Sequence, residues 1–271
     1  MDRRTTPFSG RKALETLRGQ VEDEFTTGTP AAIIKGVVDL LKAPNGPRDR
    51  QLLWGDRVLV IDRDQGHAFV QAAKDGYCGW IADDSLGPDR TPTHWVSVRA
   101  SHLYSGPKVQ AAEICALPLG AEVHVTDFDG NFAITPQGCI PKMHLRTLSD
   151  RPQDPVAVAE SLLGTPYLWG GNSNAGIDCS GLAQVSLLAC GIKALGDSDQ
   201  QQALGYELAE DQPLQRGDLL FWKGHIALVA GEDLMIHANG HTMSVAYEGI
   251  AAGIARIIDQ NGGPVTHRRR L

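Results

Sequence analysis

Residues 164–181 read GTPYLWGGNSNAGIDCSG, and this stretch with the residues after it decides the fold of the C-terminal part of the chain. The glycine pair at 170–171 and the small polar residues behind it break any helical pattern. Apolar residues then recur at helical spacing, at Leu182, Val185 and Leu188. The pattern therefore predicts a Gly-rich loop that is followed by a helix over 180–189.

Cys179 lies at the start of that predicted helix, between Asp178 and Ser180. A thiol in this position meets the positive end of the peptide dipoles, which favours its thiolate. The alternative is a small buried apolar residue, as free cysteines usually are. We interpret Cys179 as the candidate nucleophile. The other four cysteines lack such a setting, and we interpret them as core residues: Cys78, Cys115, Cys139 and Cys190.

Two histidines follow on strand-like runs, His225 in GHIALVAG and His237 in LMIHANG. His225 opens its strand, so it is the candidate general base. His237 comes twelve residues later, which leaves room for a turn and a neighbouring strand. From there it could hydrogen-bond His225 and fix its tautomer. Asn239 is the alternative third member. A Cys followed by a distant His and another polar group is the chain order of a thiol hydrolase.

These histidines do not predict a metal site. His225, His237 and His241 show neither an HxxxH helix spacing nor an HxH strand spacing, so zinc is not expected. The chemistry needs only a thiol and an imidazole. We therefore expect no cofactor.

Five spaced motifs carry a resemblance to a known family: TPYLWGG at 165–171, DCSG at 178–181, GDLLFW at 217–222, His225, and the pair at 237–238. In this order they resemble the NlpC/p60 family of cysteine peptidases, which cut peptides of the bacterial cell wall. The resemblance covers about residues 154–260. A lone DCSG would not be specific, but the ordered set is.

The resemblance implies an α+β, papain-like catalytic domain, and the local patterns agree with it. Helices are predicted over Val156–Leu163 and Ser180–Ala189. Strands are predicted over Leu219–Trp222, Ile226–Val229, Leu234–His237 and Ile254–Ile258.

The N-terminal half has a different pattern of short alternating runs, with strands predicted at 58–62, 68–73 and 77–82. Residues 39–86 are weakly similar in sequence to residues 102–145, which predicts a tandem repeat. Such units resemble the bacterial SH3-like barrels that often accompany this peptidase family. We expect two small all-β SH3-like barrels before the catalytic domain.

A short amphipathic helix is predicted over 9–25, with Ser9 as its N-cap. The expected divisions of the chain are an N-terminal helical or extended segment at 1–34, barrels at 35–90 and 91–149, and the peptidase domain at 150–271.

Substrate contacts are expected near the nucleophile, at Tyr167, Trp169, Asp178, Ser180 and Ser198. Each has a simpler alternative. Tyr167 and Trp169 alternate, so one of them could belong to the core, and Asp178 could serve only as a helix N-cap. The resemblance implies a substrate contact for Ser198, which could otherwise simply start a helix.

The family also implies two contacts from the first barrel, a Glu and a Tyr that close the site over the free amine of the substrate. Tyr77 in KDGYCGW matches the tyrosine. Asp56 in LLWGDRV stands where the family usually has Glu, and its shorter side chain could equally be a turn residue after Gly55.

Composition sets the remaining expectations. A formal net charge of −7 excludes an extended nucleic-acid surface. No stretch approaches the ~20 apolar residues of a membrane span, and the N-terminus lacks the apolar run of a secretory signal. Together with an odd, scattered set of five cysteines, this favours a reducing cytoplasm.

The resulting hypothesis is a cytoplasmic cysteine peptidase of peptidoglycan recycling. It would hydrolyse the γ-D-glutamyl-L-diamino acid bond of murein peptides whose N-terminal L-Ala is free. The alternatives are a murein endopeptidase or amidase that acts on intact wall, and a non-catalytic protein that binds wall peptides through its SH3-like modules.

Overall fold

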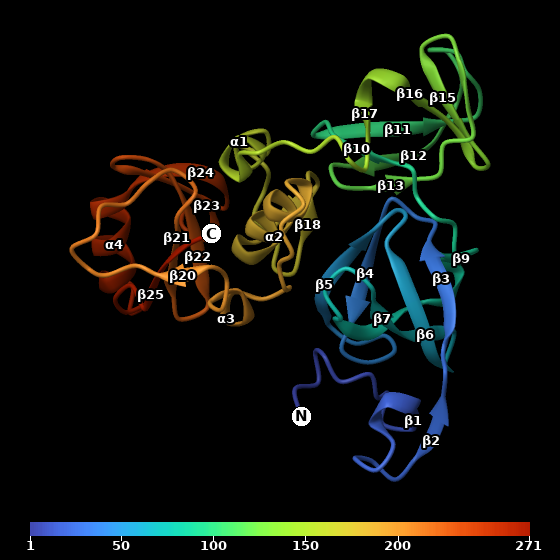
Figure 1. The fold of residues 1–271 in the computed structure, drawn as a ribbon, viewed down its shortest axis with the longest axis horizontal. Helices are drawn as coiled ribbons and strands as arrows, with labels where there is room; N and C mark the ends of the chain where they lie inside the picture. Colours follow the sequence, from blue (N-terminus) through green and yellow to red (C-terminus); the bar gives the residue numbers. More distant parts are fainter. The chain divides into compact units, whose positions relative to one another are not determined.

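The computed structural model describes residues 1–271 in two compact units, Met1–Asp150 and Arg151–Leu271. The first unit is built almost entirely from strands, and the second combines helices with one antiparallel sheet (Figure 1). None of the helices has the length and apolar character needed to span a lipid bilayer.

The N-terminal segment is not helical, so the prediction over residues 9–25 is wrong. It holds β1 (Lys12–Leu14), a single 3-10 turn and β2 (Glu24–Thr26), and the two strands pair in parallel. Ser9 caps no helix, because the chain continues as β1; its hydroxyl accepts from the N–H of Lys12 (3.0 Å) and donates to Asp62 (2.7 Å). Leu14 packs in a cluster with side chains of the following sheet. Strand pairing and this anchoring outweigh the local helical spacing.

The first barrel is a seven-stranded sheet in the order β5-β4-β8-β7-β6-β3-β9. Its strands are β3 (Thr29–Ile33), β4 (Val37–Leu41), β5 (Arg48–Leu53), β6 (Arg57–Asp64), β7 (His67–Ala72), β8 (Cys78–Ala82) and β9 (Leu86–Gly87). β3 pairs with both β6 and β9, so the sheet begins upstream of residue 35. Alternating apolar residues such as Leu40, Val58 and Val70 form its core.

The second barrel follows with a five-stranded sheet, β12-β11-β16-β15-β14, and a three-stranded sheet, β13-β10-β17. Its strands are β10 (His94–Val96), β11 (Ala100–Tyr104), β12 (Glu113–Pro118), β13 (Glu122–Val123), β14 (Asp127–Asp129), β15 (Phe132–Thr135), β16 (Gly138–Pro141) and β17 (Leu145–Thr147).

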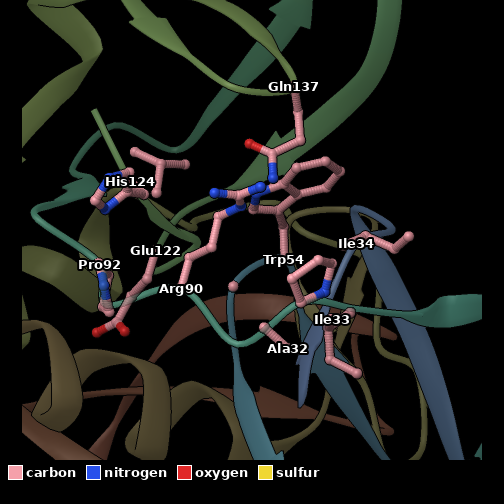
Figure 2. Close-up of a pocket in the computed structure, with 12 residues that line it drawn as sticks. Ala32, Ile33, Ile34, Trp54, Arg90, Pro92, Glu122, His124 and Gln137 are labelled. Carbon is pink, nitrogen blue, oxygen red and sulfur yellow. The ribbon is translucent and has the colours of Figure 1, made fainter. Parts of the chain in front are cut away.

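Trp54 joins the two barrels, because it follows β5 of the first but packs in the apolar core of the second. The backbone N–H of Glu122 donates to the carbonyl of Trp54 over 2.9 Å. Gly55 has φ +81°, and a Cβ there would collide with the Glu122 carbonyl, so only glycine fits. Figure 2 shows the hollow at this seam, which at about 30 Å³ has room for water but not for a peptide.

The second unit is organised around a six-stranded antiparallel sheet in the order β20-β25-β21-β22-β23-β24. Its strands are β20 (Tyr206–Glu207), β21 (Leu219–Trp222), β22 (His225–Gly231), β23 (Leu234–Asn239), β24 (Ser244–Gly249) and β25 (His267–Arg270). The short pair β18 (Asn172–Ser173) and β19 (Gly176–Ile177) lies in the loop before the nucleophile.

Four helices accompany this sheet: α1 (Pro155–Glu160), α2 (Cys179–Ala189), α3 (Ser198–Gln201) and α4 (Ile250–Asp259). α2 and α4 lie on opposite sides of the sheet (Figure 1). The strand predicted over Ile254–Ile258 is wrong, since these residues belong to α4. Ile250, Ile254 and Ile257 recur at helical spacing and pack on the sheet, and this burial decides in favour of the helix.

Candidate active site

Cys179 is the first residue of α2, and Asp178 is its N-cap. One carboxylate oxygen of Asp178 accepts from the N–H of Gly181 (2.6 Å) and from the Ser180 hydroxyl (3.0 Å). The other oxygen accepts from the N–H of Gly170 over 2.8 Å. Asp178 therefore holds the Gly-rich loop against the helix start, which orients the cysteine.

Gly181 explains the last position of the DCSG motif. A Cβ at this residue would collide with the carbonyl of Gly171, so only glycine lets the loop pass this close to the helix. In the same first turn of α2, the side-chain amide of Gln201 on α3 donates to the carbonyl of Ser180 over 3.0 Å. The start of α2 is thus fixed from two sides.

The thiol of Cys179 lies at the tight turn between β21 and β22. Its Sγ is 4.0 Å from the carbonyl oxygen of Gly224, the residue that precedes His225. Gly224 has φ +76° and completes a two-residue turn, in which Trp222 pairs with His225. This turn brings the strand that opens with His225 to the start of α2.

His225 and His237 form a hydrogen-bonded pair. Nε2 of His225 lies 2.9 Å from Nδ1 of His237. Leu228 pairs with Ile236, and continuing that register places the two histidines as diagonal neighbours on one face of the sheet. Because Nε2 of His225 is used in this way, Nδ1 is the nitrogen left to exchange a proton with a thiol.

The pair is largely shielded from solvent. His237 is fully buried, and the Trp222 ring, also fully buried, lies 5.6 Å from the His225 ring. Burial lowers the pKa of both imidazoles below its ordinary value, so both are neutral at pH 7. A neutral imidazole is the form that can accept a proton.

Asn239 has a structural role in the turn that follows it. Its side-chain oxygen accepts from the N–H groups of His241 (3.0 Å) and Thr242 (2.8 Å), and from the Thr242 hydroxyl (3.2 Å). These bonds close the turn between β23 and β24. Of the two alternatives for the third member, it is His237 that the structure brings to His225.

The other predicted contacts divide into two groups. In the second unit, Tyr167 is half-buried, and its pKa is raised by burial and by the charges of Cys179 and Asp178, so its ring lies near the nucleophile. Trp169 is 70% exposed, which excludes a core role. Ser198 is the first residue of α3 and is buried, as is Ser180.

The remaining two predicted contacts belong to the first unit. Asp56 accepts from the N–H of Leu53 (2.8 Å) and pairs with Lys74 Nζ (2.6 Å), so it closes a turn and is locally neutralised. Tyr77 is buried within the core cluster of the first barrel.

Sequence reasoning missed two residues at this site, Glu248 and Arg256. Oε2 of Glu248 on β24 lies 3.0 Å from Nε2 of His237. Arg256 on α4 holds that carboxylate through two contacts of 2.7 Å. No motif marks either residue, because their approach to His237 depends on strand register and on the helix that was predicted as a strand.

Comparisons with known proteins identify the families of both parts of the chain. Residues 164–255 match the NlpC/P60 family, and residues 40–86 match the bacterial dipeptidyl-peptidase Sh3 domain. The chain carries an NlpC/P60 cysteine peptidase domain, with a bacterial dipeptidyl-peptidase Sh3 domain before it. Its activity, stated broadly, is the hydrolysis of peptidoglycan peptides.

Three curated relatives match both parts of this peptidase. Dipeptidyl-peptidase 6 of Lysinibacillus sphaericus is 28% identical over 218 residues, 70% of this chain and 79% of the relative. Gamma-D-glutamyl-L-lysine dipeptidyl-peptidase of Bacillus cereus is 28% identical over 73% of this chain and 69% of its own length. The enzyme of the same name from Bacillus subtilis is 29% identical over 69% and 71%.

Among solved structures, an NlpC/P60 family protein from Bacillus cereus superposes with a TM-score of 0.77 at 22% identity, over 89% of this chain and 99% of that one. An NlpC/P60 endopeptidase from Photobacterium damselae gives a TM-score of 0.61 at 15% identity, over 88% and 70%. At these identities the likeness shows the shared fold.

Proposed function

We propose that this peptidase hydrolyses the γ-D-glutamyl-L-diamino acid bond of free cell-wall peptides and releases L-Ala-γ-D-Glu. The observation that carries the proposal is the thiol at the start of α2 beside the turn that leads into the His225–His237 pair. The bond is taken from the names of two relatives that align over about 70% of the chain, the gamma-D-glutamyl-L-lysine dipeptidyl-peptidases. The substrate is a murein peptide, and no cofactor takes part.

In the proposed reaction, Nδ1 of His225 takes the proton of Cys179, and Sγ attacks the γ-carbonyl carbon of D-Glu. The backbone N–H of Cys179 and the Tyr167 hydroxyl stabilise the oxyanion. Collapse of the intermediate breaks the C–N bond, and His225 protonates the leaving amine of the diamino acid. Water, deprotonated by His225, then hydrolyses the thioester and restores the thiol.

Recognition of the free N-terminus is proposed to involve Asp178 and Tyr77. Asp178 is a buried carboxylate whose hydrogen-bond donors are all neutral groups, so a substrate ammonium would be its only cationic partner. Asp56 is less suited to this role than the family's Glu, because Lys74 already pairs with its carboxylate. A requirement for a free amine fits the recycling of peptide fragments in the cytoplasm, which we propose as the setting.

The test compares L-Ala-γ-D-Glu-diaminopimelate with its N-acetylated form, with products followed by mass spectrometry. Loss of a charge-assisted contact costs ~1.5–3 kcal/mol, so the acetylated peptide should be cut at least about tenfold more slowly. Tyr77→Phe removes only the hydroxyl and should reduce the ratio of the rates on the free and the acetylated peptide. Tyr104→Phe, in the second barrel, should leave it unchanged.

Comparable rates on the free and the acetylated peptide would contradict the recycling role. Such a result would favour a murein endopeptidase that acts on intact wall. Absence of hydrolysis of either peptide would reject the proposed bond.

A further inference from the structure

Three neighbouring strands present a diagonal row of polar side chains, His225 on β22, His237 on β23 and Glu248 on β24. His237 pairs with Ala246 and Met235 pairs with Glu248, so Glu248 is the diagonal neighbour of His237 on the same face. Oε2 of Glu248 lies 3.0 Å from Nε2 of His237, a buried nitrogen that has no well-aligned hydrogen-bond partner. The row therefore continues past the two histidines to a carboxylate.

This carboxylate is held in one position. Arg256 donates from Nε to Oε1 and from Nη2 to Oε2, each over 2.7 Å. Gly253 of α4 faces the same group, and a Cβ there would lie 2.9 Å from Oε2, so its absence makes room for the carboxylate. The hydrogen bonds from Arg256 hold the pKa of Glu248 below its ordinary value. At neutral pH Glu248 is thus an acceptor only.

The negative charge of Glu248 determines which ring nitrogen carries the proton in His237 and in His225. A carboxylate beside Nε2 of His237 favours the proton on that nitrogen, which leaves Nδ1 of His237 as an acceptor. His225 must then donate from its own Nε2, and its Nδ1 is left bare. With the opposite arrangement, Nδ1 of His225 would carry a hydrogen and could not take the proton of a thiol.

We propose that Glu248 is a positioning residue that sets the tautomers of His237 and His225, so that His225 presents a bare Nδ1 to the nucleophile. The inference rests on the proposed roles of Cys179 and His225. It adds a fourth member to the site, which acts through two histidines without touching the substrate. Arg256 serves it by fixing the carboxylate.

The test is Glu248→Gln, which keeps the shape and removes the charge. One amide oxygen cannot accept from both Arg256 donors and from His237, so the Nε2–H form of His237 loses its preference. Long-range ¹H–¹⁵N spectra of the free protein distinguish Nδ1–H from Nε2–H imidazoles, and the His237 signals are assigned by their loss in His237→Gln. We expect a shift toward Nδ1–H and a kcat lower by about 10- to 100-fold, with KM nearly unchanged.

Glu160→Gln is the matched control. Arg216 also holds Glu160 through two contacts, each of 2.9 Å, but that pair touches neither histidine. The control should keep both the tautomers and kcat. Unchanged His237 tautomers in Glu248→Gln would overturn the proposal, whether or not kcat falls. Because the spectra need no substrate, they test this inference even if the proposed peptide is not cleaved.

Discussion

Cys139 and Cys179 are buried to the same degree, each 6% exposed, yet they differ in setting. Cys139 lies on β16 of the first unit, where burial and the charge of Asp129 raise the pKa of its thiol. Cys179 opens α2 in the second unit, where aligned peptide dipoles favour the anion. Exposure therefore does not distinguish a nucleophile from a core cysteine. The nucleophile is distinguished by the electric field at the start of its helix and by the histidine base nearby.

The strongest way to break this comparison is to remove each thiol in turn. Cys179→Ala should lower kcat/KM by at least ~10³-fold, because no other group can form the thioester. It should leave the unfolding midpoint nearly unchanged, since alanine fits a helix start. Cys139→Ala should keep kcat/KM within about twofold. Steady-state kinetics on the free murein tripeptide measures both.

Alkylation by iodoacetamide at neutral pH provides an independent check that needs no substrate. Cys179 should react faster than the other four thiols, two of which have a pKa raised by burial to about 12 (Cys78) and about 11 (Cys190). Equal rates at Cys179 and Cys139, or an active Cys179→Ala, would show that the helix start gives no advantage.

A second comparison concerns two buried polar residues of β23, His237 and Asn239. His237→Ala should lower kcat by about 10²-fold with KM nearly unchanged, since it acts on the base and not on the substrate. Asn239→Ala should instead lower the free energy of unfolding by about 1–3 kcal/mol, because three donors lose one buried acceptor. The reverse pattern would make Asn239 the third member of the site.

Much of this site could be predicted from sequence because its signals are local. The helix that starts at Cys179 and the strands that carry His225 and His237 follow from spacing and turn residues. Glu248 could not be found in this way. Its contact with His237 depends on the register of β23 against β24, which no short pattern encodes.

The two wrong elements have a related cause. The run at Ile254–Ile258 is rich in β-branched residues, but burial of one helical face against the sheet outweighs that propensity. Over residues 9–25, an apparent helical face gives way to pairing between Lys12–Leu14 and Glu24–Thr26. In both segments, contacts with distant parts of the chain decide the local structure.

The smallest expected effect concerns pH. Burial lowers the folded-state pKa of His225 and His237 below the ordinary value of 6.5, so below pH 6.5 the unfolded chain binds more protons than the folded one. Stability is therefore lost as pH falls from 6.5, and fully buried His237 alone should account for up to about 2 kcal/mol by pH 5. Glu248, with a lowered pKa, adds its own loss of stability only below its ordinary value of 4.5.

Urea unfolding at pH 7 and pH 5 measures this loss of stability. The difference in the free energy of unfolding between pH 7 and pH 5 should be smaller in His237→Gln. It should be unchanged in His102→Gln, which replaces an exposed histidine of the first unit. An equal loss in all three proteins would show that the buried histidine pair does not set the acid sensitivity of the second unit.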